Sequence, residues 1–203
     1  MKLVSLLSTS LAFLAFLPAA SAALIGYGVT ANGGLFSFDP DDTATATPVG
    51  SLGFVPAGID FRPVGGSSSS PVLYAISVGP VTTTLYTVNT ATGAATAVGP
   101  GFATSGAGYD LSGTQTFGFD FNPRTLQADG SVRIRLVSSG GSNLRLNSDT
   151  GLIANVDTML STAGGAVGTA VDAAAYLNTS IATNAAGGTT ALYVIDAGAN
   201  SLN

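Results

Sequence analysis

Residues 58–63 read Gly-Ile-Asp-Phe-Arg-Pro, and the pattern returns 60 positions later as Gly-Phe-Asp-Phe-Asn-Pro at residues 118–123. A second phrase follows each copy. It reads Asn-Thr-Ala-Thr-Gly at residues 89–93 and Asn-Ser-Asp-Thr-Gly at residues 147–151, which are 58 positions apart. Because the two offsets are nearly equal, a whole structural unit recurs. A period near 60 residues, with only short apolar runs inside it, indicates stacked sheets in a repeat architecture.

Apolar alternation, interrupted by Gly, Pro, Asn and Asp, predicts short strands in four blocks. The expected strands are residues 24–29, 35–38 and 45–52, then 57–61, 72–77, 84–88 and 94–98, then 116–121, 132–138, 143–146 and 152–156, and finally 170–177, 180–183 and 190–195. The second and third blocks are complete four-stranded meanders, which are the building blocks of β-propellers. We therefore predict an all-β fold, a propeller-like array of four-stranded antiparallel meanders that is incomplete at its C-terminal end.

The side chains of the repeated phrase alternate between the two faces of their strand. Four apolar residues are core candidates: Ile59, Phe61, Phe119 and Phe121. Asp60 and Asp120 lie between them and must point the other way. The Asn-x-x-Thr-Gly phrases predict tight turns with the glycine at positive φ, and residues 39–42 (Asp-Pro-Asp-Asp) occupy the corresponding place in the first block.

The N-terminal 22 residues have the pattern of a secretory signal peptide. Lys2 precedes an apolar run over residues 3–17, Pro18 interrupts it, and Ala-Ser-Ala at residues 20–22 is a cleavage pattern. We expect a mature chain of residues 23–203 that forms a single domain, with no later transmembrane segment. The predicted location is extracellular or at the cell surface.

The composition excludes several classes of function. The mature chain has five arginines, eleven aspartates, no lysine and no glutamate, a formal charge of −6. Such an acidic chain lacks the electrostatic footprint of a nucleic-acid-binding protein. The absence of histidine and cysteine excludes Ser-His-Asp triads, cysteine nucleophiles and thiolate or imidazole metal sites.

At the repeated phrases the chain resembles the domain-of-unknown-function family 4394. The resemblance lies in residues 58–63, 73–76, 85–88, 118–123, 133–138, 143–147, 175–176 and 192–196. It implies a secreted or surface-associated β-propeller-like domain without an established activity, and it adds no catalytic residue. Two departures are a longer join at residues 124–131 and an end soon after Asp196, before the last strands that the family leads us to expect.

Carboxylates are the only acid–base groups left for catalysis. Asp60 and Asp120 are the candidate catalytic pair, since equivalent positions converge if the sheets are arranged radially, and paired carboxylates can hydrolyse glycosidic bonds. The alternative is structural: each carboxylate is held by backbone N–H groups or by Arg62, Arg133 or Arg135.

Three arginines close together in the sequence form a candidate anion-binding site. Arg133 and Arg135 project from one face of a strand, and Arg145 follows nearby. The alternative is internal pairing, with the carboxylates of Asp110, Asp120 or Asp129.

Two further candidates are oxygen-based. Asp39, Asp41 and Asp42 are candidate Ca²⁺ ligands, although the EF-hand spacing is absent, and no other cofactor is expected. Asn178 begins the one Asn-x-Thr/Ser glycosylation sequon, to be modified if the source is eukaryotic.

These observations predict a secreted or cell-surface module with a binding or scaffold role, whose partner is an extracellular ligand such as a carbohydrate or a surface protein. One alternative is an Asp-based hydrolase acting on carbohydrate. Another is a fragment that self-associates through an open sheet edge along residues 192–195.

Overall fold

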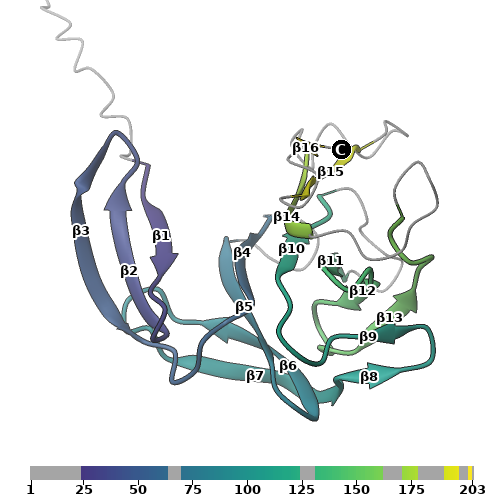
Figure 1. Ribbon diagram of the computed structural model, residues 1–203. Coiled ribbons are helices and arrows are strands. Elements are labelled where there is room, and N and C mark those ends of the chain that lie inside the picture. The colour runs from purple at the N-terminus through teal and green to yellow at the C-terminus, as the bar shows by residue number, and fades with distance from the viewer. Residues whose placement is uncertain are drawn as a thin grey trace, which may run out of the picture.

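The fold is built from antiparallel β-sheets that follow one another along an arc (Figure 1). The computed structural model describes residues 24–63, 70–123, 131–161, 171–177, 190–196 and 201–202. Within these ranges the chain forms strands and turns without a helix, so none of the described residues belongs to an apolar helix of membrane-spanning length. The predicted all-β fold class is confirmed.

Four sheets correspond to the four predicted blocks. The first contains β1 (Gly26–Val29), β2 (Gly34–Asp39) and β3 (Asp42–Ser51). The second contains β4 (Gly58–Arg62), β5 (Val72–Val78), β6 (Thr82–Val88) and β7 (Ala95–Ala103). The third contains β10 (Phe117–Phe121), β11 (Arg133–Ser138), β12 (Asn143–Asn147) and β13 (Ile153–Val156), and the fourth contains β14 (Val171–Tyr176), β15 (Leu192–Asp196) and β16 (Ser201–Leu202).

One short hairpin has no counterpart in the predicted pattern. Strands β8 (Ser105–Gly106) and β9 (Tyr109–Asp110) pair with each other between the second and third sheets. Each has only two residues, too few to give an apolar alternation. The Tyr109 hydroxyl donates a hydrogen bond to the Ala103 carbonyl and so ties the hairpin to the end of β7.

Each sheet is a simple meander in which neighbouring strands are antiparallel. The inner strands β4, β10 and β14 lie side by side, β10 between the other two, so the sheets radiate from a common centre (Figure 1). This arrangement is the predicted propeller-like array. β15 lies between β14 and β16, but the two-residue β16 pairs only with Ile195 and Asp196. The edge expected along residues 192–195 is therefore covered at Ile195, and residues 192–194 have β14 as their one strand neighbour within the described ranges.

Two apolar layers separate the first three sheets. Between the first and second sheets, Leu35, Leu52, Leu73 and Val88 are buried, with Ile59 and Phe61 packed against them. Between the second and third sheets the layer is larger, with eleven buried residues that include Ile76, Leu85, Phe119, Phe121, Ile134 and Leu146. The four predicted core candidates therefore all contribute to these layers.

Glycine is required at two kinds of position. Gly93 and Gly151, which close the two Asn-x-x-Thr-Gly turns, have φ of +76° and +69°, as predicted. Gly58 and Gly118 instead allow the inner strands to approach each other. A Cβ on Gly58 would lie 2.5 Å from the Phe119 Cβ, and one on Gly118 would lie 2.6 Å from the Ala174 Cβ.

Candidate functional site

Asp60 and Asp120 occupy the same position in consecutive inner strands. Asp60 lies opposite Tyr74 in the ladder between β4 and β5, and Asp120 lies opposite Arg135 in the ladder between β10 and β11. The neighbouring Phe119 and Phe121 pack into the layer shared with the second sheet. Because side chains alternate along a strand, Asp120 points toward the fourth sheet, and Asp60 points in the same sense toward the third.

Each carboxylate crosses to the next inner strand and accepts a backbone hydrogen bond there. Asp60 Oδ2 accepts from the Phe121 amide at 2.8 Å, and Asp120 Oδ2 accepts from the Tyr176 amide at 2.6 Å. The Asn122 amide donates to the Arg133 carbonyl, so Asn122 and Arg133 form a hydrogen-bonded pair of this ladder. Such pairs alternate with non-hydrogen-bonded pairs along an antiparallel ladder, so the amide of the adjoining Phe121 points away from β11. The aspartates therefore accept hydrogen bonds from backbone amides that point away from the sheet of the next inner strand.

The series ends at the fourth sheet. Gly58 packs on Phe119 and Gly118 packs on Ala174, so Ala175 occupies the place of Asp60 and Asp120 in β14. Ala175 is exposed. Within the described chain no further inner strand follows β14, so there is no next backbone amide for a side chain at this position to bind. Alanine at residue 175 fits this, because it has no carboxylate that would need a donor.

The two carboxyl groups also lie close enough to shift each other's pKa. Burial raises the pKa of Asp60, against the hydrogen bonds from the Phe121 amide, Asp120 and the Phe61 amide. Burial also raises the pKa of Asp120 to about 7, against the hydrogen bond from the Tyr176 amide and with a further contribution from the charge of Asp60. Because the charge of Asp60 contributes to the raised pKa of Asp120, Asp60 ionises first as pH rises.

This geometry favours the structural alternative for the aspartates over the catalytic one. Each carboxylate accepts a backbone N–H group of the next inner strand, as the structural alternative predicts. The arginines proposed as partners contact other groups, although Arg135 lies opposite Asp120 in the ladder. Arg62 is buried and its Nη1 lies 2.6 Å from Asp149 Oδ1, so it links the second sheet to the turn of the third.

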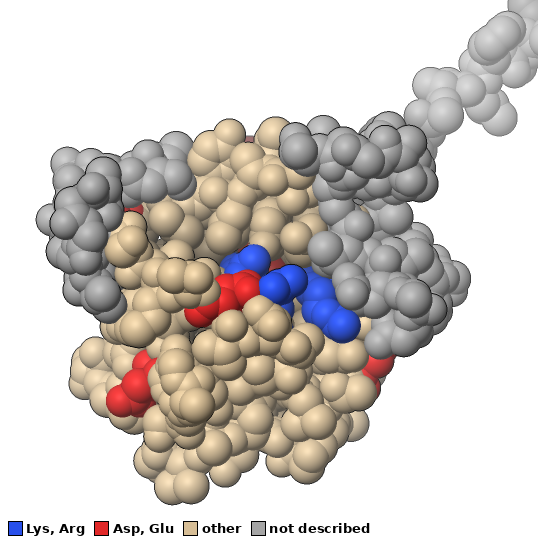
Figure 2. All heavy atoms as spheres, turned by 90° about the vertical axis from the view of Figure 1, so that its right-hand side faces the viewer, with Lys and Arg blue, Asp and Glu red and all other residues tan. Residues whose placement is uncertain are grey.

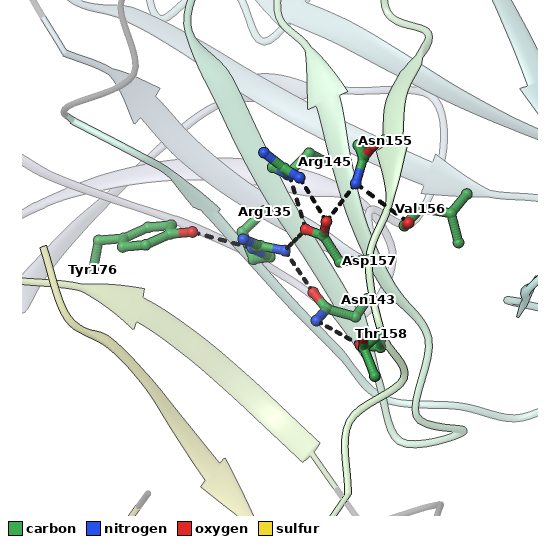
Figure 3. A network of polar contacts seen from close by, with 8 residues as sticks. All are labelled: Arg135, Asn143, Arg145, Asn155, Val156, Asp157, Thr158 and Tyr176. Carbon is green, nitrogen blue, oxygen red and sulfur yellow. Dashed lines mark hydrogen bonds and ion pairs between the residues drawn. The ribbon is translucent and has the colours of Figure 1, made fainter.

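Arg133, Arg135 and Arg145 lie on one face of the third sheet, as predicted for Arg133 and Arg135. Arg135 and Arg145 are directly opposite each other on β11 and β12. Two like charges in opposite positions repel each other unless an anion lies between them. Asp157 supplies that anion, with Oδ2 at 2.5 Å from Arg135 Nη1 and Oδ1 at 2.6 Å from Arg145 Nη2 (Figure 3).

Hydrogen bonds orient the members of this cluster. Arg135 also donates from Nε to the Tyr176 hydroxyl at 3.1 Å and from Nη1 to Asn143 Oδ1 at 2.7 Å (Figure 3). Partial burial would raise the pKa of Asp157, but hydrogen bonds from Arg145, Arg135 and Asn155 outweigh it and lower this pKa below its ordinary value. Asp157 is therefore ionised across the physiological range.

Arg133 differs from its two neighbours. Its Nη1 donates to the Ser131 hydroxyl at 2.7 Å, and no ion pair of Arg133 occurs within the described ranges. Three arginines are thus balanced by one aspartate here. Figure 2 shows blue side chains gathered in one patch on this side of the molecule, with red atoms beside them.

The prediction that Asp110, Asp120 or Asp129 neutralises these arginines is corrected: Asp157 pairs with Arg135 and Arg145. Asp120 bonds the Tyr176 amide, and Asp110 Oδ1 accepts from the Ser112 amide at 2.8 Å in an exposed turn. Asp129 lies outside the described residues. Asp157 was missed because it follows the last strand of its block, where no repeated phrase marks it.

The remaining candidates are surface features. Asp39 Oδ1 accepts from the Asp41 amide and Asp42 Oδ1 accepts from the Ala44 amide, so two of the three proposed Ca²⁺ ligands stabilise their own turn. Among the described residues, no group of three or more potential ligands is arranged to hold a metal ion. Asn178 lies outside these residues.

Comparison with known proteins places the chain in a family. One similar solved structure is the crystal structure of BBS1N in complex with ARL6DN, soaked with lead, at 16% identity and a TM-score of 0.44. The match covers 91% of this chain and 56% of that one, so this chain spans little more than half of that structure. No curated protein matches. Residues 35–203 match the family described as Domain of unknown function (DUF4394), and the chain belongs to that family.

Proposed function

We propose that this protein is a secreted or cell-surface binding module, and that the arginine face formed by Arg133, Arg135 and Arg145 recognises an anionic extracellular ligand. The ligand class that fits best is a polysaccharide with carboxylate groups. The observation that carries the proposal is the charge imbalance of this face: Arg135 and Arg145 share the carboxylate of Asp157, and Arg133 makes no ion pair within the described ranges.

The cluster already contains the required recognition chemistry. Arg145 donates from Nε and Nη2 to the two oxygens of Asp157, at 2.8 and 2.6 Å, in the bidentate geometry that arginine forms with carboxylates. The Arg145 side chain remains 41% exposed. A ligand carboxylate can pair in the same way with Arg133, which makes no ion pair with any of the residues that the structure describes.

The rest of the protein is acidic, so the arginine face is an exception to its overall charge. A formal charge of −5 over the whole chain repels polyanions in general. Binding of an acidic polymer then depends on a local surplus of positive charge, and the arginine face supplies about two such charges. Export, proposed from the sequence pattern of residues 1–22, would place this face where acidic polysaccharides occur.

The experiment is a binding screen of the purified protein against an array of acidic and neutral glycans, with and without Ca²⁺. We expect binding to uronate-containing glycans that weakens as salt rises. Arg133→Gln should weaken it about 10- to 100-fold, since a charge-assisted hydrogen bond contributes about 1.5–3 kcal/mol. Arg133→Lys, which keeps the charge but loses the planar fork, should have an intermediate effect.

Asp41→Asn is the matched control, because it changes one charge in an exposed turn of the first sheet. Its glycan affinity should equal that of the wild type. Equal binding of neutral and acidic glycans, or an affinity that Arg133→Gln leaves unchanged, would contradict the proposal.

One observation favours a second candidate function, the Asp-based hydrolase. A carboxyl group with a pKa of about 7 close to a second carboxyl group that ionises before it has the character of a general acid. The proposal has less support because both carboxylates already accept backbone N–H groups. Release of reducing sugar from a glycan that stops in both Asp60→Asn and Asp120→Asn would favour it, and no release by the wild type would contradict it.

A further inference from the structure

Among the described residues, the first sheet has no counterpart of the strand that each later sheet has at its inner edge. The turns after β2, β6 and β12 are equivalent, so β1 corresponds to β5 and β11, the second strands of their sheets. An aromatic contact supports this correspondence. Tyr27 packs edge-on against Phe61 with ring centroids 5.6 Å apart, as Tyr74 packs against Phe121 at 5.1 Å. Of the described strands, only β2 pairs with β1.

The backbone of β1 presents hydrogen-bonding groups at this open edge. The Thr30 amide donates to the Gly34 carbonyl, so Gly28 and Gly26 form the hydrogen-bonded pairs with β2, because such pairs alternate in an antiparallel ladder. The N–H and C=O groups of Tyr27 and Val29 consequently point to the open edge. Tyr74, the counterpart of Tyr27, uses the same groups to pair with Asp60 on β4.

A second observation lies across the gap, on β4. The Phe121 and Tyr176 amides each donate to an aspartate of the preceding inner strand. The equivalent donor on β4 is the Phe61 amide, and it bonds Asp60 Oδ1 of its own adjoining residue, at 2.7 Å. The carboxylate that the repeat would bring to Phe61 from the first sheet has no counterpart among the described residues.

Between these two features there is an open pocket of about 210 Å³. Tyr27 and Gly26 of β1 line one side, and Ile59 and Phe61 of β4 line the other. Ile25, also at this pocket, is 57% exposed. The gap therefore combines unpaired backbone groups with an apolar wall, which are the two components of strand-addition sites.

We propose that the edge of β1 accepts an extended segment of another polypeptide, antiparallel to β1, with the sequence pattern Gly-x-Asp-aromatic. The aspartate lies opposite Tyr27, and its carboxylate accepts the Phe61 amide. The glycine of the bound segment lies opposite Val29 and packs against Ile59. Ile59 is the residue of β4 that corresponds to Phe119 of β10, on which Gly58 packs. A side chain is excluded there for the reason that excludes one from Gly58, whose Cβ would lie 2.5 Å from the Phe119 Cβ.

The register follows from the second sheet, where Gly58 is opposite Ile76 and Asp60 is opposite Tyr74. The two Gly-x-Asp-aromatic segments of this chain, in β4 and β10, are already the inner strands of their own sheets. A second copy would have to dismantle a sheet to donate either one. The pattern occurs at no other place in the sequence, so the occupant that we propose is a separate extended segment.

The test uses a synthetic peptide, capped at both ends, with the sequence of residues 116–123 (Thr-Phe-Gly-Phe-Asp-Phe-Asn-Pro). Binding to the whole protein is measured by titration calorimetry, and the site is located by amide hydrogen exchange. We expect one peptide per protein and protection of the Tyr27 and Val29 amides. A peptide with Asp→Ala should bind about tenfold more weakly or worse, and one with Gly→Val should not bind.

The controls alter the peptide and the protein separately. An N-methyl group on the peptide aspartate removes a ladder donor without altering the protein, and it should abolish binding. Tyr27→Pro removes the corresponding donor from β1 and should do the same, while Val81→Ala, an exposed position outside the edge, should bind normally. No binding at millimolar peptide, equal binding of the Asp→Ala peptide, or protection elsewhere would overturn the proposal. Self-association that protects Tyr27 and Val29 without peptide would also overturn it, in favour of a second copy.

Discussion

Replacement of Asp120 by asparagine should remove a fall in stability that the wild type undergoes as pH rises. The asparagine would imitate the protonated aspartate, because its amide oxygen can accept the Tyr176 amide and its NH₂ group can donate to Asp60. The pKa of Asp120 rises from 3.8 in the unfolded chain to about 7 in the folded protein. The folded state then holds more protons between these values, so the contribution of Asp120 to stability is fully present below pH ~4 and is lost as pH rises through 7.

The magnitude follows from the shift. About three pKa units at 1.36 kcal/mol each give about 4 kcal/mol as an upper limit. The carboxyl is only partly buried, so solvent screening reduces this to about 2 kcal/mol. Urea unfolding at pH 4.5, 6 and 8 measures it. The wild type should lose about 2 kcal/mol relative to Asp120→Asn between the lowest and highest pH, which is about 4–8 °C in Tm.

Asp120→Ala separates the hydrogen bond from the titration. Alanine leaves the Tyr176 amide without its acceptor, so the free energy of unfolding at pH 4.5 should fall by about 1–3 kcal/mol. Asparagine should keep the wild-type value at that pH. If the wild type and Asp120→Asn change in parallel from pH 4.5 to 8, the raised pKa of Asp120 and the reasoning built on it are refuted.

Three further substitutions test the packing and the arginine cluster. Asp157→Asn removes the anion between two opposite arginines and should destabilise by about 3 kcal/mol in urea unfolding; a change below about 0.5 kcal/mol would contradict the bridging role. Gly118→Val should lower Tm by several degrees because its Cβ meets Ala174, and an unchanged Tm in a thermal melt would refute the close approach of the inner strands. Leu136→Ala should cost about 2–5 kcal/mol because the side chain is fully buried, whereas the control Leu152→Ala, which is 39% exposed, should cost less than half as much; equal losses would show that the layer between the second and third sheets is misplaced.

Much of the fold follows from the sequence because its determinants are local. Alternation in the repeated phrase predicted that Phe119 and Phe121 are buried and that Asp120 points away from them. The turn phrases predicted positive φ at Gly93 and Gly151. The equal spacing also predicted that Asp60 and Asp120 converge, which they do through hydrogen bonds between adjacent inner strands.

The partners of the charged residues were less predictable, because they depend on how separate sheets pack. Arg62 reaches Asp149 in the next sheet, 87 positions away. Tyr176, which accepts a hydrogen bond from Arg135, comes from a block whose pattern only partly repeats the earlier ones. The open edge of β1 was likewise missed, since it is recognised only when strands are compared by register across sheets.

The central claim is that aspartates of one inner strand hold the backbone of the next. Scalar couplings across hydrogen bonds in NMR spectra of the isotope-labelled protein test it directly. Such a coupling is observed only when the donor N–H group is hydrogen-bonded to that acceptor. We predict couplings from the Phe121 amide nitrogen to the Asp60 carboxyl carbon and from the Tyr176 amide nitrogen to the Asp120 carboxyl carbon. Absence of both couplings, in spectra that show those within the β10–β11 ladder, would contradict the claim.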